Sequence, residues 1–109
     1  MKLTIPERLI LIEFLNPDKE DYASWKEINR ASMSLSFTSD ELIDLNVKEG
    51  GGRVEWDSEK GKDYIVDIPL SEWITSKIQD KLRERNTKHE LEAKHLTLYE
   101  KFIVAYDQI

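Results

Sequence analysis

The chain has 109 residues, 39% of them apolar and 35% charged, with a formal net charge of -6 and no cysteine. We expect one domain, residues 1–109, and the lack of cysteine excludes disulfide bonds and thiolate metal sites. No apolar run approaches the ~20 residues of a membrane span, and the first residues lack the features of a signal peptide. The sequence therefore predicts a cytoplasmic protein that makes no membrane contact.

Two helices are predicted at the start of the chain. The first begins at a capping box, Thr4-Ile5-Pro6-Glu7, ends at Asn16-Pro17, and is apolar on nearly every side, so we expect it to be the central element. The second follows acidic residues that suit a helix N-terminus and covers Tyr22 to Leu35. Its core stripe is predicted from apolar residues spaced by three or four positions, namely Tyr22, Trp25, Ile28, Ala31 and Leu35.

A second capping box, Thr38-Ser39-Asp40-Glu41, predicts a short third helix over Thr38 to Asn46. Phe37 and Leu42 occupy the two positions of a hydrophobic staple around this helix start. We expect the inward-facing residues of this helix to be Leu42, Ile43 and Leu45.

Apolar and polar residues alternate in Arg53 to Asp57 and again in Asp63 to Ile68, which predicts two strands. We expect these strands to form a hairpin joined by Ser58 to Lys62, with Gly61 at the flexible position. Trp56 shares the apolar phase of its strand, which favours a core residue, and the alternative is a partly exposed interface anchor.

The last part of the chain predicts two more helices. One runs from about Leu70 to Arg85, and the polar stretch Asn86 to Lys94 after it is a loop or a frayed extension. A third capping-box spacing, Thr97-Leu98-Tyr99-Glu100, starts the last helix. The apolar residues of this helix are Tyr99, Phe102, Ile103 and Tyr106. We expect them to pack either on their own domain or on a second copy of the chain.

This order of elements predicts an α+β fold, with a winged-helix-like three-helix core and a β-hairpin followed by two C-terminal helices. The helix in the position that contacts DNA would be Thr38 to Asn46. It carries three acidic residues and no Lys or Arg, whereas base recognition requires Arg, Lys, Asn or Gln on that helix. The charge of the helix therefore argues against the function that its position suggests.

Three local patterns suggest chemistry, but each has a structural explanation. His89 and His95 are six residues apart, whereas a helical zinc pair needs a spacing of four, so we expect two solvated histidines. The hydroxyl-rich stretch Ser32 to Ser39 lacks a Gly-x-Ser-x-Gly elbow, and Gly50-Gly51-Gly52 lacks the Lys-Ser/Thr of a phosphate loop. We therefore expect no catalytic residue, no cofactor and no metal, and an enzyme is the least favoured class.

The predicted helix over residues 70–85 and its exit carry a basic patch of five cations against two acidic residues. The partial negative charge of a helix C-terminus favours such cations and explains the patch. The alternative is a contact surface for an acidic partner or nucleic acid. The five cations are Lys77, Lys81, Arg83, Arg85 and Lys88.

The chain resembles the short proteins of unknown function that are found in bacteriophage and prophage genomes. The stretches that carry this resemblance are Leu3-Thr4-Ile5-Pro6-Glu7-Arg8-Leu9-Ile10, Glu49-Gly50-Gly51-Gly52-Arg53-Val54-Glu55-Trp56 and His95-Leu96-Thr97-Leu98-Tyr99-Glu100-Lys101-Phe102. The resemblance assigns no functional residue. It implies a phage accessory protein or a protein that interacts with the host.

We therefore expect a non-enzymatic protein that acts through protein–protein interaction, with a host or phage protein as its partner and a homodimer as a further possibility. The alternative is a winged-helix nucleic-acid-binding regulator, which would require Arg53, Lys60, Lys62 and the cations of the 70–85 helix to lie on one face. The expected interaction surface comprises Arg53, Trp56, Lys60, Lys62, Lys81, Arg85, Tyr99 and Tyr106.

Overall fold

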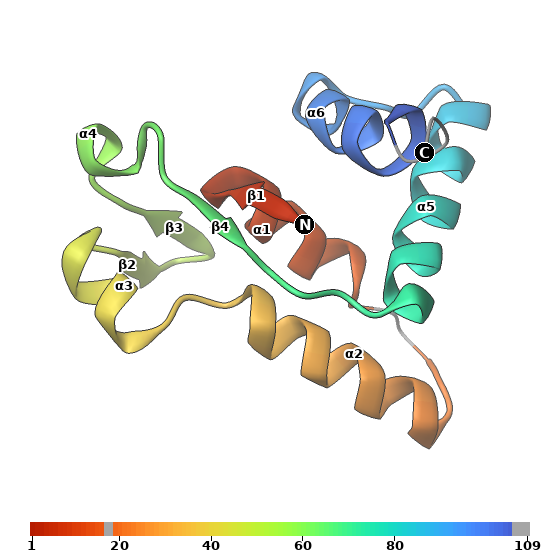
Figure 1. Cartoon of the computed structure of the whole chain (residues 1–109), viewed down its shortest axis with the longest axis horizontal. Helices are drawn as coiled ribbons and strands as arrows, with labels where there is room; N and C mark the ends of the chain where they lie inside the picture. The colour runs from red at the N-terminus through yellow and green to blue at the C-terminus, as the bar shows by residue number, and fades with distance from the viewer. Residues whose placement is uncertain (17–18, 106–109) are drawn as a thin grey trace.

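The longer helices pack their apolar faces into one core, and two small antiparallel sheets lie beside it (Figure 1). The structure, a computed structural model, describes residues 1–16 and 19–105. Its α-helices are α1 (Ile5–Phe14), α2 (Tyr22–Leu35), α3 (Ser39–Asp44), α4 (Ser58–Gly61), α5 (Glu72–Thr87) and α6 (Leu96–Tyr99). A 3-10 turn, η1 (Ala93–His95), precedes α6, and a π-helical segment, η2 (Glu100–Val104), follows it. The strands are β1 (Lys2–Thr4), β2 (Lys48–Gly50), β3 (Arg53–Glu55) and β4 (Ile65–Asp67).

The core forms where α1, α2 and α5 contact one another and the C-terminal segment covers them. α2 and α5 each contribute an apolar stripe, as a surface helix of a globular domain does, whereas in α1 only Pro6 and Glu13 are exposed. The bounds of α2 agree with the prediction, but Tyr22 was wrongly assigned to its core stripe and is 81% exposed. The core residues with the least exposure are Leu3, Ile5, Leu11, Leu35, Ile74, Ile78, Leu82, Leu98 and Phe102.

Two of the three predicted capping boxes are present. The Thr4 side chain accepts a hydrogen bond from the Glu7 N–H, and the Glu7 side chain accepts one from the Thr4 N–H, so α1 begins as predicted. Thr38 and Glu41 make the same reciprocal pair at the start of α3. Both pairs satisfy backbone donors that a helix N-terminus otherwise leaves without partners.

The predicted hairpin is wrong in its strand pairing. β3 pairs with β2, with Lys48 opposite Glu55, whereas β4 pairs with β1, with Leu3 opposite Val66. The positive φ angles of Gly51 and Gly52 suit the two-residue turn that joins β2 to β3. After β3, Asp57 caps α4, which directs the chain away before β4 begins.

The α+β class is confirmed, because the described residues contain six α-helices and two small sheets. The winged-helix likeness is not confirmed, since the two strands predicted to pair with each other lie in different sheets. None of the helices within residues 1–16 and 19–105 is both long and apolar enough to cross a bilayer.

The C-terminal part begins with α5, which extends two residues beyond its predicted end. The third predicted capping box is wrong, because Thr97 lies inside α6 and the chain has already turned at η1. Leu98 and Phe102 are completely buried, so this segment packs on its own domain. Tyr106, which was predicted to extend the last helix, lies outside the described residues.

Candidate functional site

Helix α3 shows the largest difference between the predicted and observed side-chain orientations. Leu42 and Ile43 were expected to face the core, but they are 40% and 76% exposed. The inward-facing side chain is instead Glu41, which is 8% exposed, and Leu45 is buried as predicted. The helix therefore presents its apolar side chains to solvent and directs a carboxylate inward.

The Glu41 carboxylate turns inward because a buried arginine binds it. Arg8 on α1 is 2% exposed, and its Nη1 and Nη2 donate to the two carboxylate oxygens at 2.8 and 3.0 Å. The remaining guanidinium donors bind the end of α2: Nε donates to the Leu35 carbonyl, and Nη2 donates to the Ser36 carbonyl. This bidentate geometry is the strong form of an arginine–carboxylate pair.

Two aromatic residues complete the cluster around this ion pair. The Phe37 ring lies under the guanidinium, with the Arg8 Cζ atom 4.9 Å from its centroid. The Tyr64 hydroxyl donates to the second Glu41 oxygen at 2.8 Å. Hydrogen bonds from Arg8 above all, opposed by burial, lower the pKa of Glu41 to about 2, and the Glu41 contact raises the pKa of Tyr64.

The consequence is a short helix that is held firmly and presents an apolar surface. Glu41 links α3 to α1 and, through Tyr64, to the segment that leads into β4. Asp40 and Asp44 are exposed on the same helix as Ile43. Ile43 is therefore an exposed apolar side chain on a helix that also presents two carboxylates to solvent.

The β2–β3 hairpin and α4 lie at the same end of the molecule as α3 (Figure 1). We call residues 38–63 the hairpin end. Trp56 was predicted to be a core residue, and it is half-buried, with its ring against Gly61. An open hollow of about 370 Å³ lies beside it and is lined by Val54, Glu55, Trp56 and Ser58.

The residues predicted for the interaction surface fall into two separate groups. Arg53, Lys60 and Lys62 are exposed at the hairpin end, near Trp56. The other described members lie around α5 and α6 on the far side of the molecule (Figure 1). These members, Lys81, Arg85 and Tyr99, form the second group. The structure therefore does not bring the predicted set together.

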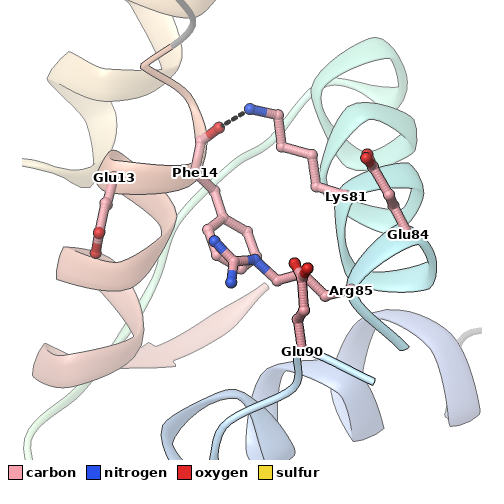
Figure 2. Close-up of a pocket in the computed structure, with 6 residues that line it drawn as sticks. All are labelled: Glu13, Phe14, Lys81, Glu84, Arg85 and Glu90. Atoms are coloured by element: carbon pink, nitrogen blue, oxygen red, sulfur yellow. Dashed lines mark hydrogen bonds between the residues drawn. The ribbon is translucent and has the colours of Figure 1, made fainter. Parts of the chain in front are cut away.

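This second group lies next to a charged pocket of about 330 Å³ between α1 and α5 (Figure 2). Lys81 donates to the Phe14 carbonyl at the end of α1, and the Arg85 guanidinium lies 5.1 Å from the Phe14 ring centroid. The Tyr99 hydroxyl accepts a hydrogen bond from the Asn86 side chain. Besides Phe14, the lining residues are Glu13, Lys81, Glu84, Arg85 and Glu90.

The pocket offers three carboxylates and two cations but no serine, threonine or histidine in its lining. Within residues 1–16 and 19–105, no group of three His, Asp or Glu side chains is placed to hold a metal ion. Lys81 and Arg85 bind the end of α1, as cations do at a helix C-terminus. The pocket therefore lies at a junction between α1 and α5 that these two cations help to hold together.

Two further cations of the basic patch form ion pairs, one with a residue before α2 and one with a residue of α5 itself. Lys77 donates to Glu20 at 2.9 Å, and Lys88 donates to Glu84 at 2.8 Å. The nucleic-acid alternative required these cations to share one face with Arg53, Lys60 and Lys62. The two sets lie on elements at opposite ends of the fold (Figure 1), so one nucleic-acid contact would have to extend across the molecule.

Sequence reasoning missed Arg8, Tyr64 and the inward orientation of Glu41. Arg8 was the available signal, because it is the one cation in an otherwise apolar and acidic helix, and a buried arginine requires a carboxylate partner. Glu41 was assigned to a capping box, and it performs that role together with the ion pair. The expectation of two solvated histidines is wrong for His95, which is 2% exposed.

Comparisons with known proteins add no family. No family model matches the chain, and no curated protein and no solved structure does either. The resemblance to bacteriophage and prophage proteins therefore stays a prediction, and the function is argued from the site alone.

Proposed function

We propose that this chain is a non-enzymatic interaction protein that binds a protein partner through its hairpin end. The observation that carries the proposal is Ile43, which is 76% exposed on a helix fixed by a buried ion pair. A fixed backbone reduces the ordering cost of binding, and a large exposed apolar side chain supplies contact area. A phage or host origin of the partner and a cytoplasmic location are further parts of this proposal.

The charge of the hairpin end supports a basic partner. Residues 38–63 hold eight acidic and four basic residues, which leaves a net charge of -4. We expect the partner to contribute an apolar side chain that packs on Ile43 and Leu42, with Lys or Arg residues facing Asp40 and Asp44. Complementary charge of this kind sets specificity and association rate more than affinity.

Nucleic-acid binding is the competing proposal, and the exposed face of α3 disfavours it. A helix that enters a DNA groove approaches phosphates, which bind Lys and Arg and repel carboxylates. Self-association is a separate proposal, since Leu96 and Val104 remain 55% and 45% exposed on the C-terminal segment. Size-exclusion chromatography with light scattering at high concentration tests it, and a strict monomer removes it.

The test compares capture of partner proteins by immobilised wild-type protein and by the Ile43→Lys variant. Ile43 is exposed, so this change should alter the free energy of unfolding by less than about 0.5 kcal/mol. We expect the variant to lose the proteins that the wild type retains, because a lysine replaces the apolar contact and repels a basic partner.

The matched control is Ile65→Lys, which adds the same charge at a 55% exposed isoleucine on β4. Retention of the same proteins by this control places the contact on α3. Equal capture by the wild type and both variants would refute the proposed surface. If the wild type retards a DNA duplex at low salt and Ile43→Lys binds it more tightly, the nucleic-acid proposal replaces ours.

A further inference from the structure

His95 lies where the C-terminal segment covers the end of α1. Its side chain is 2% exposed, and its ring centroid lies 5.4 Å from that of Phe14 at an angle of 40°. Leu98, one helical turn further along the segment, is completely buried. His95 is therefore part of the contact through which η1 and α6 pack against α1.

One hydrogen bond fixes the protonation state that this contact requires. The Glu92 N–H donates to His95 Nδ1 at 3.0 Å, so Nδ1 must carry a lone pair. A neutral imidazole protonated at Nε2 satisfies this geometry. The imidazolium ion does not, because both of its ring nitrogens carry hydrogen and Nδ1 would then meet the Glu92 N–H as a second donor.

The charges that surround His95 also act on its protonation. Burial, Arg85 on α5 and Lys94 on its own segment lower the pKa of His95 below 6.5, whereas Glu92 and Glu13 raise it by smaller amounts. Arg85 contacts the same Phe14 ring as His95. Protonation would thus place a second cation against an aromatic ring that already binds one.

We propose that His95 is an acid-sensitive latch, whose protonation releases η1 and α6 from the end of α1 and uncovers Phe14. The release is local, because η2 has its own attachments. Gln79 Nε2 donates to the Phe102 carbonyl at 2.8 Å, and Lys101 Nζ donates to Glu7 at 2.7 Å. Neither bond involves His95. The Phe14 ring that the release uncovers lines the charged pocket of Figure 2.

The direction of the effect follows from linkage. A histidine whose pKa is lower in the closed state than in the open state stabilises the closed state at pH values above 6.5. That stabilisation is lost as the pH falls from 6.5 through the pKa of the closed state. In this interval the equilibrium constant for opening rises by at most about tenfold for each pH unit of decrease, because opening is coupled to the binding of one proton.

The experiment uses the His89→Gln variant, which leaves His95 as the one imidazole in a chain that has two. NMR follows the His95 ring and the exchange of the amides of residues 93–99, corrected for chemical exchange, from about pH 7 to about pH 5. We expect a midpoint below 6.5 and a parallel loss of protection in residues 93–99. The Phe14 ring resonances should change with the same midpoint.

His95→Gln in the same background is the matched variant, because its side-chain oxygen can accept the Glu92 N–H without titrating. Its amide exchange in residues 93–99 should be independent of pH over the same range. A His95 midpoint at or above 6.5, or protection that persists while His95 titrates, would overturn the proposal. If His95→Gln does not fold, the titration of the His89→Gln protein still decides between these outcomes.

Discussion

At the scale of single residues, the Arg8–Glu41 pair determines which surface of α3 faces solvent. Both side chains are buried, at 2% and 8% exposure, and all four heavy-atom partners of the guanidinium lie within 3.0 Å. Removing one partner of such a pair leaves an uncompensated charge in a poorly solvated place. The pair therefore matters both for stability and for the position of Ile43.

Glu41→Gln should lower the free energy of unfolding by about 3 kcal/mol, the lower end of the range for buried ion pairs, because Glu41 also borders solvent at the start of α3. Urea denaturation measures this change. Asp40→Asn removes an exposed carboxylate from the same helix and should change the stability by less than about 0.5 kcal/mol. Equal stability of the two variants would contradict the role of the ion pair.

The same pair predicts a dependence of stability on pH. The pKa of Glu41 is lowered from 4.5 to about 2, so its contribution is present above pH 4.5 and is lost as the pH falls toward 2. Over this interval the wild type should lose more stability than Glu41→Gln, which cannot titrate at this position. Parallel stability curves for the two proteins would show that Glu41 makes no pH-dependent contribution.

Gly61 was expected to supply flexibility, but its environment shows a need for space. A Cβ atom at Gly61 would lie 2.7 Å from Trp56 Cδ1 and 3.1 Å from Ile5 Cδ1. Gly61→Ala should therefore cost about 1 to 3 kcal/mol, as overpacking does. Gly50→Ala is the control, since a Cβ there meets no atom within 4 Å. Thermal unfolding of the two variants distinguishes close packing from general glycine effects.

At the scale of elements, local signals predicted helix starts well and strand pairing poorly. The capping boxes at Thr4 and Thr38 depend on residues three positions apart, which a sequence displays directly. The pairing of β1 with β4 joins Leu3 to Val66, and no local pattern marks a three-residue strand at the N-terminus. The orientation of α3 was missed because it depends on Arg8, which is 33 residues away from Glu41.

The start of α3 gives a test at this scale. Thr38→Ala removes the side-chain oxygen that accepts the Glu41 N–H and should cost about 0.5 to 2 kcal/mol. Ser39→Ala, one residue later, is the matched control and should be nearly neutral. Partner capture by folded Thr38→Ala protein should persist, because the contact surface is formed by side chains beyond the cap.

At the scale of the whole molecule, the fold separates two kinds of surface. The hairpin end presents exposed apolar and acidic side chains on α3, whereas the α1–α5 junction uses its cations to hold helices together. The sequence predicted the basic patch as a feature of the C-terminus of its own helix, whereas Lys81 donates to the carbonyl at the end of α1 and Arg85 lies over the Phe14 ring. What the sequence did not show is that Ile43 is exposed at the hairpin end.

The most direct test of the account is the hydrogen-exchange footprint of the chain in complex with the partner that the wild type captures. We expect amides of residues 39–57 to gain protection on binding, because α3 and the β2–β3 hairpin form the proposed contact surface. Residues 72–105 should exchange as they do in the free protein. Protection confined to residues 72–105, with none in α3 or the hairpin, would contradict the central claim.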